Sequence, residues 1–229
     1  MDVRVPAVCI AVDIKNSSLL NKTELLESLN LCRSAVNKEF ASTLLVKAEL
    51  RGGDELVAVS ENIGDTRHLM ETVRLILGKN DLPFYMGVGI GFIENAETSI
   101  HTVNGSAVLN AMRARDDELK SSRQSKKESS FYILSEEVPD SSLNSMYLTI
   151  LEKKKQWTAK QQDVIDIIEK HPEWTFEQAG KKLGYKSPKS AVSYLLARSQ
   201  YARVKGMEEA YDELTRFYQD YLQQKAGCR

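Results

Sequence analysis

Carboxylate side chains occur at two places in the chain where they could bind a metal ion. Asp13 closes the apolar run Ala-Val-Cys-Ile-Ala-Val, and Asp54 and Glu55 follow the paired glycines Gly52 and Gly53. A hard divalent cation prefers oxygen ligands and is usually bound by one or two carboxylates together with substrate phosphates. Glycines carry no Cβ, so phosphate groups can approach the backbone beside them. Asp13 and Asp54 are therefore predicted to hold Mg²⁺ or Mn²⁺ over a phosphorylated ligand.

Purely structural roles compete with this interpretation. Gly-Gly is a favoured pair in a tight hairpin turn, and the two acids after such a turn would simply be solvated. Asp13 ends a strand-like apolar run, where an unpaired carboxylate would be costly. A helix N-cap or a salt bridge would satisfy Asp13 as well as a metal ion would.

Hydrophobic periodicity indicates the elements that position these residues. It predicts strands at 7–14, 42–50, 55–60, 84–93 and 131–134, and helices at 22–41, 65–78, 104–120 and 141–156. Gly87, Gly89 and Gly91 stand at every second position of the fourth strand, which favours close packing of a helix on that strand. Segment 121–130 has no apolar residue and is predicted to be a surface loop.

The order of these elements predicts an α+β domain over residues 1–152. A strand, a helix, a two-stranded hairpin, a helix, a strand, a helix, a strand and a helix would form a sheet of about five strands with helices on one face. This order is close to the ferredoxin-like split βαβ arrangement. In such a sheet the first strand lies beside the hairpin, so Asp13 would lie beside the turn that carries Asp54.

Residues 153–229 are predicted to form a helix-turn-helix domain. Helical segments at 157–171, 175–184 and 187–200 follow one another, with a Thr-x-x-Gln capping box at Thr175 and Gly184 as a helix stop. A last helix at 205–224 needs something to pack against. Its apolar face includes Tyr211, Leu214, Tyr218 and Tyr221. This face either covers the helix-turn-helix or forms a dimer seam.

A basic segment lies over the helix-turn-helix pattern. Residues 181–205 contain seven lysines and arginines and no acid. Such a patch is typical of a surface that contacts a phosphate backbone, and the first residues of a recognition helix meet base edges. The expected contacts to double-stranded DNA are Lys186, Lys189, Ser190, Ser193, Tyr194 and Arg198. A solvated basic face on a protein-docking module is the alternative.

Composition limits the class of protein. The 229 residues are 42% hydrophobic and 28% charged, as in ordinary soluble globular proteins. Residues 1–150 carry 16 basic and 21 acidic residues, and the remainder carries 15 and 11, which suggests two units with different jobs. Three cysteines without a C-x-x-C pair favour a reducing cytosol. The apolar N-terminal run is too short to span a membrane.

Two short stretches resemble a known active site. The pairing of AVDIKNSS (11–18) with RGGDELVA (51–58) resembles the palm domain shared by class III nucleotide cyclases, GGDEF diguanylate cyclases and the palm polymerases of CRISPR systems. The stretches YMGVGIGFI (85–93) and NGSAVLNAMRAR (104–115), together with the helix-turn-helix, more narrowly resemble the SatD family of bacterial proteins. The resemblance covers most of the chain.

The palm resemblance implies roles for the acids. Asp13 and Asp54 would bind Mg²⁺ or Mn²⁺, and the carbonyl group of Ile14 would join them. Glu55 would assist charge or proton handling during attack of a ribose 3′-hydroxyl on an α-phosphate. In such enzymes two metal ions stabilise the attacking and leaving oxygens.

Further residues are expected to contact a nucleoside triphosphate. The expected contacts are Ile14, Lys15, Asn16, Gly52, Gly53 and Arg113. For Lys15 and Asn16 a role in the turn after the first strand is an equal alternative. An arginine fork matches phosphate oxygens, but Arg113 and Arg115 are two apart and point in different directions on a helix. At most one of them is therefore expected to reach the triphosphate.

Two functions follow from the sequence. The leading hypothesis is a cytoplasmic, metal-dependent nucleoside triphosphate-binding protein, acting as a nucleotide cyclase or signalling-nucleotide synthase and coupled to a helix-turn-helix. The alternative is a non-enzymatic DNA-binding transcriptional regulator, whose palm-like domain senses a ligand or dimerises. A homodimer is a further expectation, because cyclases commonly place the active site between two subunits.

Overall fold

The computed structural model describes residues 4–94, 99, 101–121 and 130–227. The chain divides into two compact units, of which the first comprises Met1–Asn144 with Asp212–Arg229 and the second comprises Ser145–Tyr211. Most of the predicted 121–130 loop and Cys228 lie outside the described residues. Among the helices that are described, none has the length and apolar character needed to cross a membrane.

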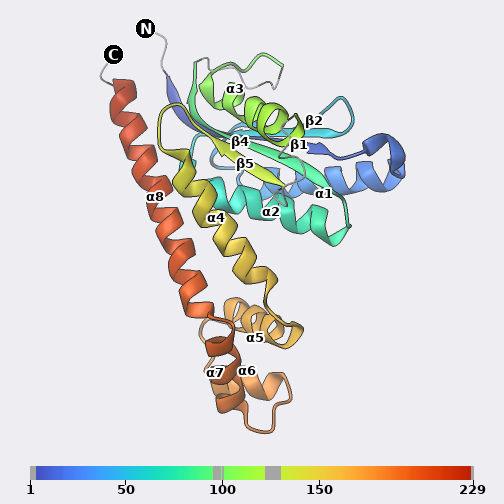
Figure 1. Cartoon of the computed structure of the whole chain (residues 1–229), viewed down its shortest axis with the longest axis vertical. Coiled ribbons are helices and arrows are strands. Elements are labelled where there is room, and N and C mark those ends of the chain that lie inside the picture. Colours follow the sequence, from blue (N-terminus) through green and yellow to red (C-terminus); the bar gives the residue numbers. More distant parts are fainter. Residues whose placement is uncertain (1–3, 95–98, 100, 122–129, 228–229) are drawn as a thin grey trace. The chain divides into compact units, whose positions relative to one another are not determined.

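A mixed sheet forms the centre of the first unit (Figure 1). Its described strands are β1 (Val5–Ile14), β2 (Leu44–Arg51), β3 (Glu55–Ser60), β4 (Phe84–Ile93) and β5 (Phe131–Leu134), in the order β2-β3-β1-β4-β5. Neighbouring strands are antiparallel except for β4 and β5, which are parallel. The first four strands have the ferredoxin-like order, and β5 extends it. The predicted α+β fold of palm type is therefore confirmed.

Strand β1 is the central strand and is buried on both faces. Every residue from Pro6 to Val12 is buried, as expected for a continuous apolar run flanked by two other strands. Partial exposure returns at Asp13, near the end of the strand. The sequence therefore places a carboxylate where the buried stretch of β1 ends.

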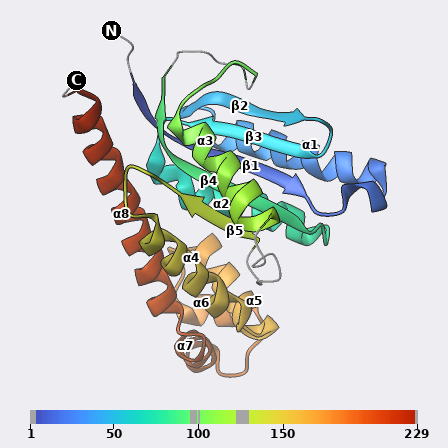
Figure 2. The same cartoon turned by 45° about the horizontal axis from the view of Figure 1, so that its top comes forward.

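Helices cover both faces of the sheet. On one face lie α1 (Lys22–Glu39) and α2 (Thr66–Lys79), and α3 (Ser106–Arg113) lies across the other (Figures 1 and 2). Helix α3 continues into a π-helical segment, Ala114–Lys120. The expectation of helices on one face thus holds for α1 and α2 but not for α3.

The glycines of β4 explain the position of α3. A Cβ on Gly89 would lie 2.0 Å from the carbonyl oxygen of Ala107, and one on Gly87 would lie 2.1 Å from that of Ala111. The helix backbone therefore rests directly on the strand, which only glycine permits at this distance. This confirms the packing role that the period-two spacing predicted.

The second unit is helical where the helix-turn-helix was predicted. Its helices are α5 (Ala159–Lys170), α6 (Phe176–Lys182) and α7 (Pro188–Arg198), and its core includes Val164, Ala179 and Val192, one from each helix. Capping boxes begin α5 at Thr158 and α6 at Thr175, the second as predicted. Gly184 ends the α6 segment with φ 76°, again as predicted. Helices α4 (Asp140–Lys155) and α8 (Tyr201–Gly227) contribute residues to both units.

The second half of α8 belongs to the first unit, which differs from the expected boundary at residues 152 and 153. Arg67 of α2 is buried and donates hydrogen bonds to both carboxylate oxygens of Asp212, at 2.8 and 2.6 Å. The Tyr218 hydroxyl donates to the carbonyl oxygen of Pro139 at 2.8 Å. The apolar face of the last helix is therefore partly covered by its own chain.

Candidate functional site

The two predicted acidic segments meet at the end of strands β1 and β3. Asp13 is directly opposite Glu55 in the antiparallel register, and the amide of Ile14 donates to the carbonyl oxygen of Asp54 at 3.4 Å. Side chains that are directly opposite on neighbouring strands point to the same face of the sheet. Asp13 and Glu55 therefore share a face of the sheet. This is the face that α3 covers, since Ala11, two residues before Asp13, belongs to the same core cluster as residues of α3.

Asp54 belongs to the hairpin turn and has a different neighbour. Its carboxylate accepts a hydrogen bond of 2.6 Å from the hydroxyl of Ser17. Ser17 begins a short 3₁₀ turn, Ser17–Leu19, in the connection between β1 and α1. The hairpin turn and the β1–α1 connection are thus joined through this carboxylate.

Two cationic side chains from the segment after α3 reach the shared face. The ammonium group of Lys120 lies 2.9 Å from Oδ2 of Asp13. The guanidinium group of Arg115 forms an ion pair with Glu55 and donates to both carboxylate oxygens of Asp116, at 2.8 and 2.7 Å. Each strand-end acid of the shared face therefore has a positive partner supplied by the chain itself.

The π-helical segment explains why Arg115 and Lys120 act together. They are five residues apart, and the backbone amide of Ser121 donates to the carbonyl oxygen of Asp116, also five residues earlier. This i→i+5 pattern widens the turn and brings residues five apart closer to one face than an α-helix does. Sequence periodicity of the α-helical kind does not predict this pairing.

The ion pairs around Arg115 shift the pKa values of Arg115 and Asp116. Burial of Arg115 lowers its pKa, but hydrogen bonds and charge attraction from Asp116 and Glu55 outweigh this and raise the pKa above its ordinary value. The hydrogen bond from Arg115 lowers the pKa of Asp116. Arg115 therefore remains a fixed positive charge beside Glu55, and Asp116 remains a carboxylate at neutral pH.

The remaining residues of the β1–α1 connection have mixed surroundings. Ile14 is buried. The ammonium group of Lys15 lies 4.2 Å from the centroid of the Tyr85 ring, and burial lowers the pKa of Lys15. Asn16 adopts the left-handed conformation with φ 54°, and its carbonyl oxygen accepts from the amide of Leu19. Asn16 therefore has the turn role that was the alternative to phosphate contact.

A pocket of about 310 Å³ opens between the hairpin turn and the start of α1. Its lining residues are Ser17, Ser18, Lys22, Leu25, Leu26, Gly52, Gly53 and Asp54. Gly52 and Gly53 have φ values of 62° and 96°, and a Cβ built on Gly53 would meet no atom within 4 Å. The turn thus requires glycine for its conformation, and the space beside Gly53 is open.

Arg113 does not reach the strand-end acids. Its side chain is 54% exposed and forms an ion pair with Glu136. Arg115, two residues later, is the arginine that lies beside Glu55. Residues two apart on a helix point in different directions, and the sequence did not determine the rotation of α3 about its axis.

The donor set suits only one kind of metal site. Among the described residues, no group of three or more His, Cys, Asp or Glu side chains is arranged to hold a metal ion. The backbone register nevertheless places Asp13, Asp54 and Glu55 at the ends of adjacent strands. The chemistry fits a hard cation bound by one or two carboxylates and by phosphate oxygens, and a cation bound by the carboxylates alone would be held weakly.

The residues predicted to contact DNA are all exposed in the second unit. The exposed side chains are Lys186, Lys189, Ser190, Ser193, Tyr194 and Arg198. From Lys189 onwards their spacing follows the turns of α7, while Val192 packs in the core on its other side. The Arg198 guanidinium lies 5.9 Å from the centroid of the Tyr194 ring. Ser187 precedes α7 as predicted, but its side chain makes no capping hydrogen bond.

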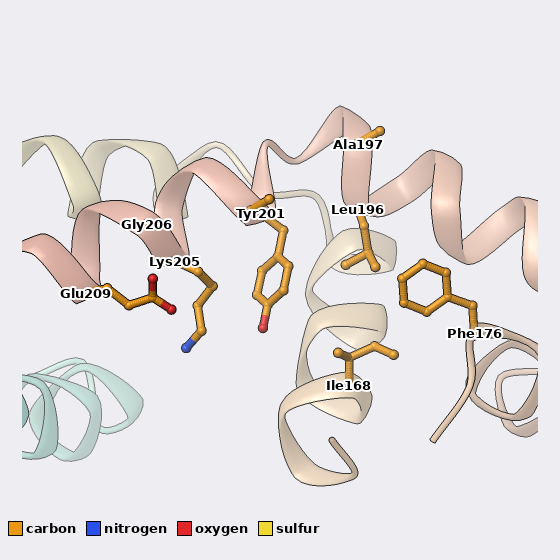
Figure 3. Close-up of a pocket in the computed structure, with 9 residues that line it drawn as sticks. Ile168, Phe176, Leu196, Ala197, Tyr201, Lys205, Gly206 and Glu209 are labelled. Atoms are coloured by element: carbon orange, nitrogen blue, oxygen red, sulfur yellow. The ribbon is translucent and has the colours of Figure 1, made fainter. Parts of the chain in front are cut away.

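A second pocket, of about 480 Å³, lies within the second unit (Figure 3). Its labelled residues include the apolar side chains of Ile168, Phe176 and Leu196 and the polar side chains of Tyr201 and Lys205. Lys205 is already paired with Glu169 and Glu208, both at 3.2 Å. Glu209 and Gly206 also line this pocket, but its walls are mainly apolar and it does not contain the paired acids of the strand-end site.

Comparisons with known proteins add little to this geometry. No family model matches the chain, and no curated protein matches it. Among solved structures, the chain is similar to the crystal structure of the guanylyl cyclase Cya2, with 18% identity and a TM-score of 0.36, over 49% of this chain and 70% of that chain. The assignment of the site therefore depends on the residues of this chain.

Proposed function

We propose that the first unit binds a nucleoside triphosphate together with Mg²⁺ or Mn²⁺ at the ends of β1 and β3. One observation carries this proposal: the backbone places Asp13 opposite Glu55 and next to Asp54, at an open glycine turn where Asp54 also lines a pocket. A paired-carboxylate edge beside accessible backbone is the arrangement that metal-bound phosphates need. The resemblance to palm enzymes supports the same proposal.

Each part of the site has a proposed role. Asp13 and Asp54 would hold the cation, with Glu55 beside them. A bound divalent cation would neutralise phosphate charge and polarise phosphate oxygens. Gly52 and Gly53 would let phosphates approach the backbone. On the basis of the palm resemblance, we further propose that the nucleotide is cyclised or condensed through its ribose 3′-hydroxyl.

The pocket beside the turn has the composition expected for the rest of the nucleotide. Leu25 and Leu26 supply an apolar wall that suits a planar base, and the hydroxyls of Ser17 and Ser18 suit a sugar. Lys22 adds a positive charge at the start of α1. The hydrogen bond from Ser17 to Asp54 would connect this pocket with the acids.

Calorimetry with non-hydrolysable ATP and GTP analogues, with and without Mg²⁺ or Mn²⁺, tests the proposal. Wild-type protein is expected to bind at least one analogue only when the metal is present. Asp13→Asn and Asp54→Asn should each weaken binding at least about tenfold, because each removes a charged oxygen ligand. Glu136→Gln removes one carboxylate elsewhere on the surface, where Glu136 is 61% exposed, and should leave binding unchanged. Absence of metal-dependent binding to wild type would refute the proposal.

A second function, DNA binding by the second unit, is favoured by the exposed face of α7. Lys189 and Arg198 are exposed at the two edges of the α7 surface that also carries Ser190, Ser193 and Tyr194, and neither belongs to the helical core. Lysine and arginine at the start and end of such a helix would neutralise phosphates of double-stranded DNA. This function is compatible with the first, and together they describe a nucleotide-responsive regulator.

Mobility shifts on random-sequence duplex DNA over a salt series test this second function. Binding should fall steeply as salt rises, because each neutralised phosphate releases counterions. Lys189→Ala and Arg198→Ala should weaken binding and flatten the salt dependence. Lys170→Ala removes an exposed charge from α5 and serves as the control. Binding that ignores both substitutions would exclude this face of α7 as the DNA surface.

A further inference from the structure

We infer that Lys120 is a positioning residue that controls access of a divalent cation to Asp13. The inference rests on the proposed function and extends it to a residue outside the acidic motif. Its basis is the ion pair between Lys120 Nζ and Asp13 Oδ2 at 2.9 Å. In the described structure the ammonium group occupies an oxygen that a metal ion would need.

The two cations of the network differ in how firmly they are held. The Arg115 side chain is 10% exposed and is held by both Glu55 and Asp116. The Lys120 side chain is 34% exposed and ends in a single flexible ammonium group. Lys120 is therefore the cation that can leave, whereas Arg115 is fixed.

Asp116 gives Lys120 a second partner. Lys120 Nζ lies 3.4 Å from Asp116 Oδ1 as well as 2.9 Å from Asp13 Oδ2. A small movement of the lysine side chain would exchange one carboxylate for the other. The ammonium group would remain paired, so its departure from Asp13 would not leave an isolated charge. Asp13 would then be available to a metal ion.

Charge repulsion makes the two occupants of Asp13 compete. An ammonium group and a divalent cation on the same carboxylate would lie within a few ångströms, where like charges repel strongly. A metal ion must therefore displace Lys120 or bind more weakly beside it. Without nucleotide, the lysine should hold the site in a state of low metal affinity.

Mn²⁺ binding to the nucleotide-free full-length protein, measured by electron paramagnetic resonance, tests the inference. Lys120→Met should tighten Mn²⁺ binding about tenfold. A unit charge within a few ångströms shifts the pKa of a carboxyl group by about one to three units, and its effect on cation binding by the same carboxylate should be of similar size. Lys120→Arg keeps the positive charge and should behave like wild type. Arg113→Met changes net charge equally but lies in the exposed pair with Glu136, so it should also behave like wild type.

A double variant shows whether the gain passes through Asp13. Adding Asp13→Asn to Lys120→Met should abolish the tighter binding. Equal Mn²⁺ affinity in wild type and Lys120→Met would overturn the inference. The proposed function would survive that result if the calorimetry with nucleotide still showed metal-dependent binding. Loss of metal binding in both experiments would instead refute the proposed function.

Discussion

At the scale of single residues, Arg115 is the most constrained charge of the candidate site. Its guanidinium group is buried, pairs with Glu55 and donates two hydrogen bonds to Asp116. A fork geometry suits such simultaneous pairing with two carboxylates. Arg115 therefore stabilises the fold at the same place where it adjusts the charge of the site.

Arg115→Met is expected to destabilise the first unit by about 3 kcal/mol, because removing one partner of a largely buried pair leaves an uncompensated charge. Glu55 carries that charge: its side chain is only 14% exposed, and it would keep only the longer contact to Arg51, at 3.8 Å. Chemical denaturation followed by circular dichroism measures the loss. Arg113→Met breaks an exposed pair and should cost less than about 1 kcal/mol. Equal effects of the two substitutions would contradict the assigned burial.

The same network predicts a dependence of stability on pH. The hydrogen bond from Arg115 lowers the pKa of Asp116 in the folded protein below its ordinary value of 3.8. An acid with a depressed folded pKa stabilises the fold above its unfolded pKa and loses this contribution as pH falls through the folded value. Stability should therefore decrease below about pH 4. Asp116→Asn should flatten the curve there, as thermal unfolding between pH 2 and pH 6 would show.

The sequence indicates the acids of the site better than it indicates their cations. Asp13 ends a buried strand and Asp54 follows a glycine turn, and local patterns reveal both features. Lys120 and Arg115 reach the site only because a π-helical segment sets their direction. That segment depends on how α3 packs on β4, which is a tertiary effect that one-dimensional periodicity does not contain.

At the scale of elements, the contact between α3 and β4 decides where those cations lie. Gly89→Ala should destabilise the first unit by about 3 kcal/mol or prevent folding, because overpacking against backbone cannot be relieved by side-chain movement. The added Cβ would meet the Ala107 carbonyl oxygen at 2.0 Å and the Ala111 amide nitrogen at 2.3 Å. Thermal unfolding of the full-length protein measures the change.

Gly78→Ala provides the matched control for this substitution. Gly78 lies in α2, and a Cβ there would meet no atom within 4 Å. Alanine in a helix is more stable than glycine by up to about 1 kcal/mol, so this variant should be neutral or more stable. A Gly89→Ala protein as stable as Gly78→Ala would show that α3 does not rest on β4.

Element types followed from the sequence more directly than their packing did. Apolar periodicity located the strands and helices of the first unit, and the glycine spacing predicted that a helix packs on β4. Which face that helix would cover was not fixed. The continuous apolar run of β4 indicates that both of its faces are buried, but it does not say which helix covers each of them.

At the scale of the whole molecule, the first compact unit is built from two separate stretches of the chain. A change in charge between the two halves suggested a single boundary, yet residues from Asp212 onwards belong to the first unit. Arg67 and Asp212 are far apart in sequence, and neither shows locally that it has a partner. Burial of Tyr211 and Tyr218 also removes two of the four residues of the face that suggested a dimer seam, while Phe217 and Tyr221 stay exposed.

A chain that ends after Tyr211 should therefore lose stability in its first unit. The truncation removes Leu222, which is fully buried, and the partners of Arg67 and Pro139 on α8. Loss of such buried contacts should lower the melting temperature of that unit by about 10 °C. Differential scanning calorimetry against the full-length chain measures this shift.

The exposed aromatic residues of α8 separate this expectation from a dimer seam. Phe217→Ser changes a side chain that is 63% exposed, so it should leave the melting temperature and the mass unchanged if α8 serves the fold of its own chain. If α8 instead forms a seam between two copies, Phe217→Ser should lower the mass, because exposed aromatic residues anchor such interfaces. Light scattering on Phe217→Ser and calorimetry on the truncated chain therefore distinguish the two roles of α8. A lower mass for Phe217→Ser than for wild type would show that wild-type copies associate through α8. A lower melting temperature for the truncated chain, with no change in mass for Phe217→Ser, would show that α8 serves the fold of its own chain.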